Sequence, residues 1–499
     1  MILIKYINQF DFEYDIQGMV RSFFPGEEMH TQREQEENYI PDLTGGVLIL
    51  ECSFQEQDMS ISLIKEGKCV AHVVFQKVYD SSGYNRKETK NELKRKLYDI
   101  FHDITGKELP WGTLSGIRPT KITSALLESG MSCEEVRTHM KNTYYLSEGK
   151  TEESIKISAT ELKILKDIDY KNGYSLYIGI PFCPSTCLYC SFTSNPVSRF
   201  SDRIDMYLET LFKEIEFCAE IFKGKRLCTV YIGGGTPTTL SAVQLDRLLS
   251  KISQVYNTKD LYEYTIEAGR PDSITREKLK VIRKYDITRI SINPQTMKDE
   301  TLKIIGRHHT VRQFIDAYEM AREEGFDNIN MDFILGLPGE DIEDVKYSMN
   351  WVERLKPDSL TIHSLAIKRA ARLNLEKSLD YQNYKGYKIN NSEEIMQITK
   401  DTAEKLGLTP YYLYRQKNMA GNLENTGYAR ETKEGIYNIL IMEEKQTILA
   451  VGAGSSSKMV LPDSNVIDRV ENVKDVELYI NKIDEMIDRK RQYILEHFE

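Results

Sequence analysis

The chain has 499 residues, of which 66 are Lys or Arg and 76 are Asp or Glu, so its formal net charge is −10. This length allows roughly two to four domains with ample hydrophobic core. The acidic balance argues against a nucleic-acid or anionic-membrane partner that binds through bulk charge, and leaves room only for a local basic groove.

Cysteine usage indicates a reducing compartment. The chain has eight cysteines, and five of them are scattered without the pattern of a disulfide framework. These five are Cys52, Cys69, Cys133, Cys218 and Cys228. The apolar stretch at the start is too short for a signal peptide, and no later apolar run is long enough to span a bilayer. We therefore expect a cytoplasmic protein without a membrane span.

Residues 1–110 are expected to form a small N-terminal α/β domain. Alternating apolar residues predict strands over 46–54, 60–65 and 69–76, and a charged helix is predicted over 86–105. No residue in this domain belongs to a recognisable catalytic pattern.

Residues 111–170 are expected to be a linker that contains helices. Its first part, 111–121, is rich in turn-forming residues. Arg118 and Lys121 in that part could bind an anion, but a solvated connector is the preferred interpretation, because surface loops are usually connectors. The charged stretch 147–169 is predicted to be helical and leads into the next domain.

Residues 171–366 alternate short apolar strands with amphipathic helices, which is typical of a parallel β/α array. Six strands are predicted, over 176–180, 229–232, 262–267, 289–292, 328–333 and 359–363. One of the predicted helices between them carries an apolar stripe of Leu245, Leu248, Leu249 and Ile252. The pattern predicts an α/β protein with a partial (β/α)6 TIM-like barrel, followed by a C-terminal α+β domain over 367–499.

Three closely spaced cysteines, Cys183, Cys187 and Cys190, follow the first predicted barrel strand. Their Cys-x3-Cys-x2-Cys spacing suggests a [4Fe–4S] cluster, because three thiolates ligate three irons and leave the fourth iron open. The alternative is buried or zinc-binding cysteines, but no nearby His or Cys completes a tetrahedral zinc site. An open iron can bind a substrate or a cofactor.

Polar and glycine residues lie at, near or just after the ends of the other predicted strands. They are the run Gly233-Gly234-Gly235-Thr236-Pro237, then Glu267, Gln295, Asp332 and the segment 363–366. Chemistry in a β/α barrel gathers at the carboxyl ends of its strands. We therefore expect these residues and the cysteine loop to line one mouth, which favours a single active site.

Each of these features has a simpler alternative. The glycines could form only a tight turn, although they also let backbone groups approach a ligand, and they lack the Gly-x-Gly-x-x-Gly spacing of a dinucleotide fold. Glu267 could be a surface acid, but a carboxylate at a barrel mouth is suited to ribose hydroxyls. His308 and His309 could be ligands or proton donors, but they are interpreted as loop residues. The adjacent Arg307 is the candidate functional residue of this segment.

The cysteine spacing resembles the signature of the radical S-adenosylmethionine (SAM) enzymes. Further motifs are similar to those of the oxygen-independent coproporphyrinogen III oxidases (dehydrogenases), in the longer branch with an extra N-terminal domain. They are Tyr177-x-x-x-Pro-Phe-Cys183, the Gly-Gly-Gly-Thr-Pro turn, Arg289-Ile-Ser-Ile-Asn-Pro-Gln295, Asn330-Met-Asp332-Phe-Ile-Leu-Gly336-Leu-Pro338, Lys356-Pro-Asp-Ser-Leu360, Tyr411-Tyr-Leu-Tyr-Arg415 and Ala450-Val-Gly-Ala-Gly454. The resemblance covers most of the chain.

The resemblance implies a [4Fe–4S] cluster and one or two SAM molecules as cofactors. By motif, the cluster ligands are Cys183, Cys187 and Cys190. The positions around the first SAM are Tyr177, Tyr189, Gly234, Gly235, Thr236 and Glu267, the last of which holds the ribose. The positions that contact a second SAM are Gln295, Arg307, Asp332 and Ala366.

The implied reaction is the conversion of coproporphyrinogen III to protoporphyrinogen IX in haem biosynthesis. A 5′-deoxyadenosyl radical removes hydrogen from a propionate carbon, and loss of CO2 and one electron leaves a vinyl group. The propionate carboxylates of a tetrapyrrole need positively charged partners that can donate two hydrogen bonds each, and Arg369 and Arg415 are the candidates. A solvated basic helix start is an equal alternative for Arg369.

The resemblance also assigns partners and catalytic roles. Tyr177, Arg369 and Arg415 are the candidate catalytic residues, and the C-terminal domain would cover the substrate. An electron donor such as flavodoxin or ferredoxin would be the protein partner.

Two positions differ from the typical family pattern. Members carry a fourth cysteine where this chain has Phe192, and a histidine where it has Gly179. Related proteins that lack the fourth cysteine deliver haem as chaperones or open the haem ring, so a haem chaperone or an enzyme for another tetrapyrrole is the alternative. The chaperones' His-Asn-x-x-Tyr-Trp motif corresponds here to 436–442, which lacks the His and the Trp.

Overall fold

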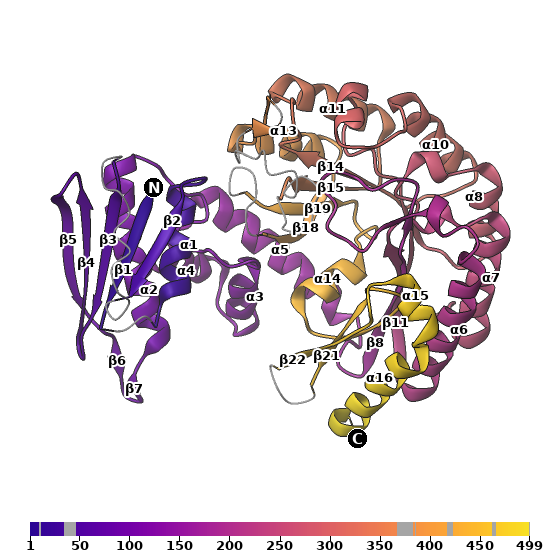
Figure 1. Ribbon diagram of the computed structural model, residues 1–499, viewed down its shortest axis with the longest axis horizontal. Helices are drawn as coiled ribbons and strands as arrows, with labels where there is room; N and C mark the ends of the chain where they lie inside the picture. The colour runs from indigo at the N-terminus through magenta and orange to yellow at the C-terminus, as the bar shows by residue number, and fades with distance from the viewer. Residues whose placement is uncertain are drawn as a thin grey trace. The chain divides into compact units, whose positions relative to one another are not determined.

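Figure 1 shows the computed structural model, which describes residues 1–8, 11–33, 46–366, 383–384, 386–416, 423–461 and 466–498. The chain divides into two compact units, Met1–Ile155 and Lys156–Glu499. The domain boundaries expected near 110, 170 and 366 stay predictions. Within the described residues, no helix combines the length and the apolar character needed to cross a membrane.

The first unit contains a five-stranded mixed sheet in the order β2-β1-β3-β4-β5. Its strands are β1 (Ile2–Ile7), β2 (Met29–Arg33), β3 (Leu48–Phe54), β4 (Asp58–Lys65) and β5 (Lys68–Gln76). β1 is parallel to both β2 and β3, whereas β3, β4 and β5 are antiparallel. The three strands expected from sequence are present, but β1 and β2 were not foreseen.

Helices complete this unit. They are α1 (Glu13–Phe23), α2 (Arg86–Thr105), α3 (Thr120–Glu128) and α4 (Cys133–Tyr144), with the small hairpin of β6 (Tyr79–Asp80) and β7 (Gly83–Tyr84). α1 and α2 bury one face of the sheet, and α4 packs against α2 and α3. Alternate strand residues such as Ile61 and Leu63 have no exposed surface and belong to the same cluster as Leu93 and Leu97 of α2. α2 spans the predicted range, because Asn85 caps its start and Gly106 ends it with a φ of 64°.

The second unit is built on six contiguous parallel strands, as the sequence predicts (Figure 1). They are β8 (Gly173–Ile180), β11 (Arg226–Gly234), β12 (Glu263–Glu267), β13 (Arg289–Ser291), β14 (Ile329–Leu335) and β15 (Ser359–Ser364). Each strand pairs in parallel with its neighbour in chain order. All six carboxyl ends therefore lie at one end of the sheet.

Helices between the strands cover the outer side of this sheet in Figure 1. They are α6 (Ile204–Ile221), α7 (Ala242–Val255), α8 (Arg276–Arg283), α10 (Val311–Glu323) and α11 (Ile342–Leu355). The short helix α9 (Asp299–Ile304) lies instead at the cysteine loop, where its Leu302 packs in one cluster with Leu188. On α7 the predicted stripe of leucines has no exposed surface, and a capping box formed by Ser241 and Gln244 fixes the helix start. Burial of each leucine contributes roughly 1.5–3 kcal/mol.

The C-terminal part adds strands to both edges of the same sheet, which has eleven strands in all among the described residues. These strands are β18 (Thr409–Tyr414) and β19 (Asn425–Ala429) beyond β15, and β20 (Thr447–Val451), β21 (Ser456–Val460) and β22 (Ile467–Glu471) beyond β8. The helices of this part are α13 (Glu393–Lys405), α14 (Ile436–Glu443), α15 (Val476–Asn481) and α16 (Ile483–Phe498). The helix α5 (Glu148–Lys166) precedes β8 in the chain, and its Leu165 packs with Tyr411 and Tyr412 of β18.

A buried polar network attaches the C-terminal helices to the barrel. Lys490 of α16 forms an ion pair with Glu214 of α6, and both side chains have no exposed surface. Glu214 also accepts hydrogen bonds from the Tyr479 hydroxyl at 2.5 Å and from the Gly452 N–H at 2.8 Å. The network therefore fixes the end of β20 beside β8.

Candidate active site

The cysteine loop runs from β8 to α6 and contains three short elements. They are β9 (Phe182–Cys183), β10 (Asn195–Pro196) and the 3-10 helix η2 (Val197–Arg199). Cys187 is buried, Cys183 and Cys190 are half-buried, and none of the three forms a disulfide. The Leu188 N–H donates to the Ile305 carbonyl at 2.9 Å, so the loop is held by the segment that follows α9.

The donor set of this loop suits an iron–sulfur cluster. Within the described ranges, no group of three or more His, Cys, Asp or Glu side chains is placed to hold a metal ion. Each cysteine of a [4Fe–4S] cluster binds a different iron, so its ligands need not converge on one ion. Arg270 and Arg307 both hydrogen-bond to Cys187, and their positive charges suit an anionic group bound by thiolates.

The glycine turn at the end of β11 packs directly on the cysteine loop. The Thr236 N–H donates to the Phe182 carbonyl at 2.7 Å, and a Cβ on Gly235 would lie 2.5 Å from the same oxygen. Only glycine permits this approach. As a result, the Thr236 hydroxyl lies 3.5 Å from the Cys183 sulfur.

Glu267 ends β12 beside the glycine turn. The Tyr231 hydroxyl donates to Glu267 Oε1 at 2.5 Å, and the Gly234 backbone also hydrogen-bonds to this carboxylate. Burial raises the pKa of Glu267 to about 7; the hydrogen bonds oppose this rise and the nearby Asp332 carboxylate adds to it. The group therefore changes charge near neutral pH.

Three tyrosine rings lie nearly parallel next to Glu267. The centroids of Tyr231 and Tyr437 are 4.5 Å apart at 22°, and those of Tyr177 and Tyr231 are 6.1 Å apart at 14°. Tyr177 comes from β8, Tyr231 from β11 and Tyr437 from α14. Burial raises the pKa of each phenol, so all three stay neutral.

Gln295 follows β13 with a left-handed backbone, at a φ of 68°. Its N–H donates to the Asp332 carbonyl and its carbonyl accepts from the Ile334 N–H, both at 3.0 Å, so the residue is fixed on β14. The side chain is buried, and Oε1 has no hydrogen-bond partner among the described residues. A buried acceptor without a partner marks a place where a ligand can donate.

Asp332 of β14 lies at the same mouth. Asn330 Nδ2 donates to its Oδ1 at 2.6 Å, and His363 Nε2 lies 3.9 Å from its Oδ2. Although burial opposes ionisation, the nearby His363 and hydrogen bonds from Asn330 and Thr361 lower the pKa of Asp332. This carboxylate is therefore ionised under conditions in which Glu267 is partly protonated.

Arg307 reaches the cysteine loop from the segment between α9 and α10. Its Nη1 donates to the Asn293 carbonyl at 2.6 Å, and its guanidinium hydrogen-bonds to Tyr189 and Cys187. Its Nε has no partner within the described part of the chain. Arg307, Tyr189 and Cys187 are thus brought together in the structure.

His309 lies two residues beyond Arg307 and is also buried. Burial lowers its pKa to about 3, and the positive charges of Arg307 and Arg270 contribute to that shift. The imidazole is therefore neutral, and neither ring nitrogen has a hydrogen-bond partner in the described ranges.

The candidate substrate residues are placed only in part. Arg415 follows β18 and is buried, and burial lowers its pKa to about 10, against the attraction of Glu424. Ala366 directly follows β15 and is half-buried. Arg369 lies outside the described residues, so its position stays a prediction.

The two positions that depart from the family pattern have different surroundings. Phe192 is 69% exposed, the largest exposed fraction among the large hydrophobic residues described. A Cβ on Gly179 would lie 3.2 Å from the Val451 carbonyl of β20, which is a tight contact. A histidine there would press on β20, so glycine fits the present strand pairing.

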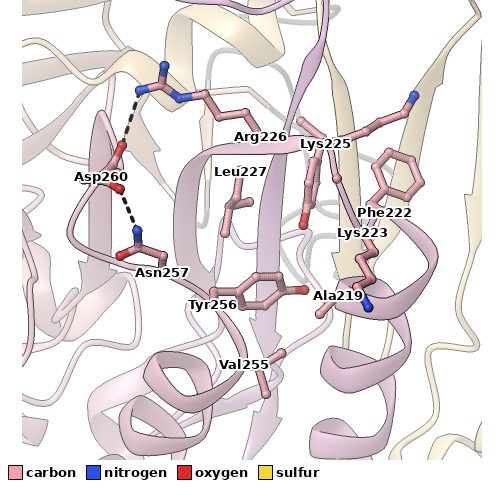
Figure 2. Close-up of a pocket in the computed structure, with 12 residues that line it drawn as sticks. Ala219, Phe222, Lys223, Lys225, Arg226, Leu227, Val255, Tyr256, Asn257 and Asp260 are labelled. Carbon is pink, nitrogen blue, oxygen red and sulfur yellow. Dashed lines mark hydrogen bonds between the residues drawn. The ribbon is translucent and has the colours of Figure 1, made fainter.

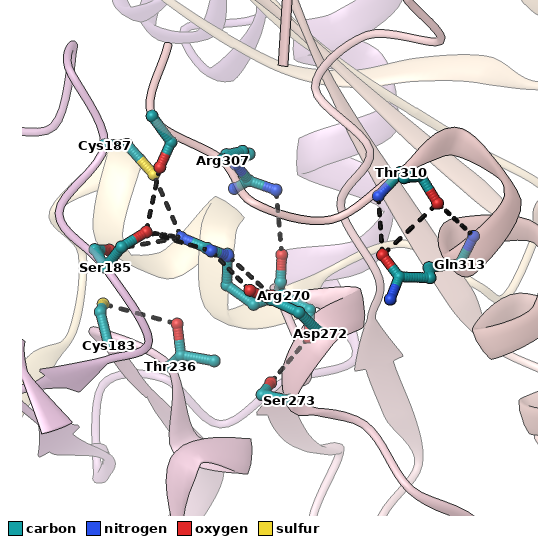
Figure 3. Close-up of polar contacts among 12 residues, drawn as sticks. Cys183, Ser185, Cys187, Thr236, Arg270, Asp272, Ser273, Arg307, Thr310 and Gln313 are labelled. Atoms are coloured by element: carbon teal, nitrogen blue, oxygen red, sulfur yellow. Dashed lines mark hydrogen bonds and ion pairs between the residues drawn. The ribbon is translucent and has the colours of Figure 1, made fainter. Parts of the chain in front are cut away.

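Sequence reasoning missed Arg270, Asp272 and Tyr231, whereas His363 belongs to the segment 363–366 that was expected at the mouth. Arg270 and Asp272 follow Glu267 by three and five residues, so the rule about carboxyl ends of strands could have identified them. Tyr231 lies inside an apolar strand and carries no signal that separates it from core. Figure 3 shows Arg270 between Asp272 and the cysteine loop.

A cavity of about 620 Å³ lies elsewhere, at the amino ends of the strands (Figure 2). It is lined by Tyr174 at the start of β8, by the 219–227 connection and by residues 255–257 and 260. Asn257 donates to Asp260 at 2.6 Å, and the Arg226 guanidinium stacks on Tyr262 at 4.4 Å. These residues connect helix ends to strand starts and take no part in the mouth described above.

The chain is similar to known radical SAM proteins. The model of the radical SAM superfamily matches residues 177–352. The chain is 41% identical over 420 residues to the oxygen-independent coproporphyrinogen-III oxidase-like protein HemZ of Bacillus subtilis (strain 168), covering 83% of this chain and 82% of that protein. It is 37% identical over 194 residues to the heme chaperone HemW of the same organism, covering 39% and 50%.

Two further similarities concern coproporphyrinogen III oxidases. The chain is 31% identical over 192 residues to the oxygen-independent enzyme of Escherichia coli (strain K12), covering 38% of this chain and 42% of that protein. Among solved structures, coproporphyrinogen III oxidase (HemN) from Escherichia coli matches with a TM-score of 0.50 and 23% identity, covering 65% of this chain and 73% of that one. The structural match supports the fold alone.

Proposed function

The chain belongs to the radical SAM superfamily, in the family of the oxygen-independent coproporphyrinogen III oxidase-like protein HemZ. We propose that it oxidatively decarboxylates coproporphyrinogen III to protoporphyrinogen IX without oxygen. The family implies a [4Fe–4S] cluster and SAM. When bound, these two groups supply a radical that abstracts hydrogen from unactivated carbon.

In this proposal the cysteine loop holds the cluster through Cys183, Cys187 and Cys190. The buried positive charges at Cys187 stabilise the anionic ligands, and the close packing of the glycine turn excludes water from one side of the loop. The chain thereby positions the cluster and excludes water from it, and the cofactors supply the hydrogen abstraction.

The residues around the glycine turn bind and orient SAM. Glu267 accepts hydrogen bonds from the ribose hydroxyls, and Tyr177, Tyr189, Gly234, Gly235 and Thr236 surround the rest of the molecule. Gln295, Arg307, Asp332 and Ala366 contact a second SAM. The buried Gln295 Oε1 and Arg307 Nε, which lack protein partners in the described ranges, support a ligand at that second place. Two SAM molecules suit two successive decarboxylations.

The substrate is a tetrapyrrole whose propionate carboxylates need cationic partners. Arg415 and Arg369 are the proposed donors, and a planar guanidinium can pair with a carboxylate through two hydrogen bonds. Loss of a hydrogen atom, CO2 and one electron from a propionate leaves a vinyl group. The proposal places the protein in the cytoplasm, where a donor such as flavodoxin or ferredoxin supplies electrons to the cluster.

One observation carries the proposal. The cysteine loop, the glycine turn, Glu267 and Gln295 lie at or just after the ends of four neighbouring parallel strands, and Asp332 lies within the fifth, β14. The similarity to HemZ extends over 420 residues, well beyond the 177–352 that match the superfamily model. This extent favours a tetrapyrrole enzyme over a radical SAM protein of another kind.

A second candidate is a radical SAM enzyme for another tetrapyrrole, or a haem chaperone. The exposed Phe192 favours it, because the typical family pattern has a cysteine there. Against the chaperone, the stretch comparable to its haem motif carries Tyr437, which is buried against Tyr231. A residue in that position is not available to bind haem.

The test is an anaerobic assay of the iron- and sulfide-reconstituted protein with reductant, SAM and coproporphyrinogen III. We expect 5′-deoxyadenosine and protoporphyrin to rise together, Cys187→Ser to abolish both products, and Cys133→Ser, an exposed cysteine of α4, to leave them unchanged. Formation of 5′-deoxyadenosine without decarboxylated product would indicate another tetrapyrrole. Tight haem binding without either product would support the chaperone.

A further inference from the structure

Arg270 links the loop after β12 to the cysteine loop. It directly precedes the 3-10 helix η4 (Pro271–Ser273), and its side chain is only 3% exposed. Its Nη1 lies 3.6 Å from the Cys187 sulfur and 3.2 Å from the Ser185 hydroxyl, and it also donates to the Ser185 carbonyl at 3.3 Å. Figure 3 shows the guanidinium directed at both residues.

Ser185 extends this contact to a third segment. Its hydroxyl donates to the Gly306 carbonyl at 3.0 Å while it accepts from Arg270. Arg307 next to Gly306 hydrogen-bonds to the same Cys187. The central cysteine is therefore held between two guanidiniums that come from the loops after β12 and α9.

Asp272 holds the other side of Arg270. Arg270 Nε donates to Asp272 Oδ1 at 3.0 Å and Nη2 donates to Oδ2 at 2.7 Å, the two-pronged geometry of a strong ion pair. Although burial opposes ionisation, the hydrogen bonds and charge of Arg270 lower the pKa of Asp272. The carboxylate is thus anionic and offsets part of the positive charge that Arg270 presents to Cys187.

Arg307 and His309 are further titratable groups near Arg270. Arg307 also hydrogen-bonds to Cys187, but it is held by different partners. Arg307 donates to the carbonyls of Asn293 and Gly269, at 2.6 and 3.4 Å. His309 is neutral, because burial lowers its pKa to about 3. Asp272 is the carboxylate paired with Arg270 in the described part of the chain.

We propose that Arg270 is a positioning residue that fixes the Cys187 thiolate and raises the reduction potential of the cluster, and that Asp272 limits this rise. The inference rests on cluster ligation in the proposed function and is independent of the substrate. One-electron reduction adds a negative charge to the cluster, so a neighbouring cation and an N–H···S hydrogen bond stabilise the reduced form. A neighbouring carboxylate stabilises the oxidised form.

The two partners should therefore act in opposite directions. In full-length protein reconstituted with iron and sulfide, the potential is measured by anaerobic redox titration with electron paramagnetic resonance detection. At the wild-type midpoint we expect Arg270→Gln to lower the ratio of reduced to oxidised cluster about tenfold, or 59 mV for one electron. Asp272→Asn should raise this ratio, because Asn keeps a hydrogen-bond acceptor for Arg270 but removes the negative charge.

Arg276→Gln is the matched control, because it removes the same charge from a nearby arginine that is 47% exposed and pairs with Glu323 and Glu324. It should leave the ratio unchanged. If Arg270→Gln takes up no cluster, Arg270→Lys, which keeps the charge, and Asp272→Asn decide the question. The inference is overturned if the potentials of Arg270→Gln and Asp272→Asn stay at the wild-type value, or if both move in the same direction. A wild-type protein that binds no iron overturns the proposed function as well.

Discussion

Glu267 and Asp332 carry different charges at the same mouth because their surroundings differ. Glu267 is buried and receives hydrogen bonds from Tyr231 and Gly234, which only partly compensate for burial, so its pKa rises to about 7. Asp332 is hydrogen-bonded by Asn330 and lies near His363, and its pKa is lowered. Of these two carboxylates, only Glu267 therefore titrates in the physiological range.

This difference predicts a pH dependence of SAM binding. If Glu267 accepts hydrogen bonds from the ribose, its ionised form is needed, and the ionised fraction falls from about nine tenths at pH 8 to about one tenth at pH 6. We expect SAM to bind the cluster-loaded protein about tenfold more weakly at pH 6, as measured by equilibrium dialysis. Asp332 stays ionised and the Tyr231 phenol stays neutral over this range.

Glu267→Gln should bind SAM weakly and without this pH dependence. Glu277→Gln, on the exposed face of α8, is the matched control and should keep the wild-type slope. A Glu267→Gln variant that shows the same slope as the wild type would assign the titration to a different group.

Residues of the candidate site could be predicted from the sequence only where a chemically distinctive residue lies at the end of a predicted strand. The cysteine spacing and the position of Glu267 at a strand end sufficed to place them at one mouth. Tyr231 could not be foreseen, because a tyrosine within an apolar strand reads as core until its hydroxyl is seen 2.5 Å from Glu267. The left-handed backbone of Gln295 has no sequence signal, since glycine or asparagine is expected at such positions.

At the scale of elements, the six barrel strands were predictable because each is an apolar run between helices with one amphipathic face. The edge strands β18 to β22 were not, because they are short and partly antiparallel and their order depends on distant contacts. β20, for example, pairs in parallel with β8 although some 270 residues separate Ile448 from Ser175. β1, α1 and β2 were not predicted; β2 (Met29–Arg33), for example, is mostly polar and lacks the alternating apolar residues that indicate a strand.

The buried pair that fixes β20 gives a prediction about stability. Lys490→Met leaves the Glu214 carboxylate buried without its cation, which costs about 3–5 kcal/mol. The two tryptophans of the chain, Trp111 and Trp351, lie in different units. In a Trp111→Phe background, the fluorescence of Trp351 therefore reports urea unfolding of the larger unit alone.

Lys482→Met provides the control for this measurement. Lys482 pairs with Glu485 at 3.1 Å, but both side chains are more than half exposed. Its loss should change the free energy of unfolding by no more than about 0.5 kcal/mol. Equal effects of the two substitutions would contradict the assignment of β20 attachment to the buried network.

At the scale of the whole molecule, the residues proposed for the cluster and SAM all belong to the second unit. The C-terminal strands lie in the same sheet as the barrel, and α14 contributes Tyr437 to the tyrosine stack beside Glu267. The first unit has its own hydrophobic core, which contains Ile61, Leu63 and Leu97. Each unit thus has the buried core that independent folding requires.

The final prediction is that a fragment of residues 147–499 binds the cluster and SAM as the full chain does. The cut is placed before Ser147 because its carbonyl and hydroxyl accept hydrogen bonds from the first turn of α5, and the later part of that helix buries Leu165 against Tyr411 and Tyr412. Iron content per chain and SAM affinity are the measurements, and both should match the full-length protein. A second fragment that starts at Lys156 removes the first turns of α5 and should unfold at a lower urea concentration. If 147–499 folds but takes up no iron, the first unit is needed for cluster binding, and the role of the N-terminal domain would have to be sought at the cluster itself.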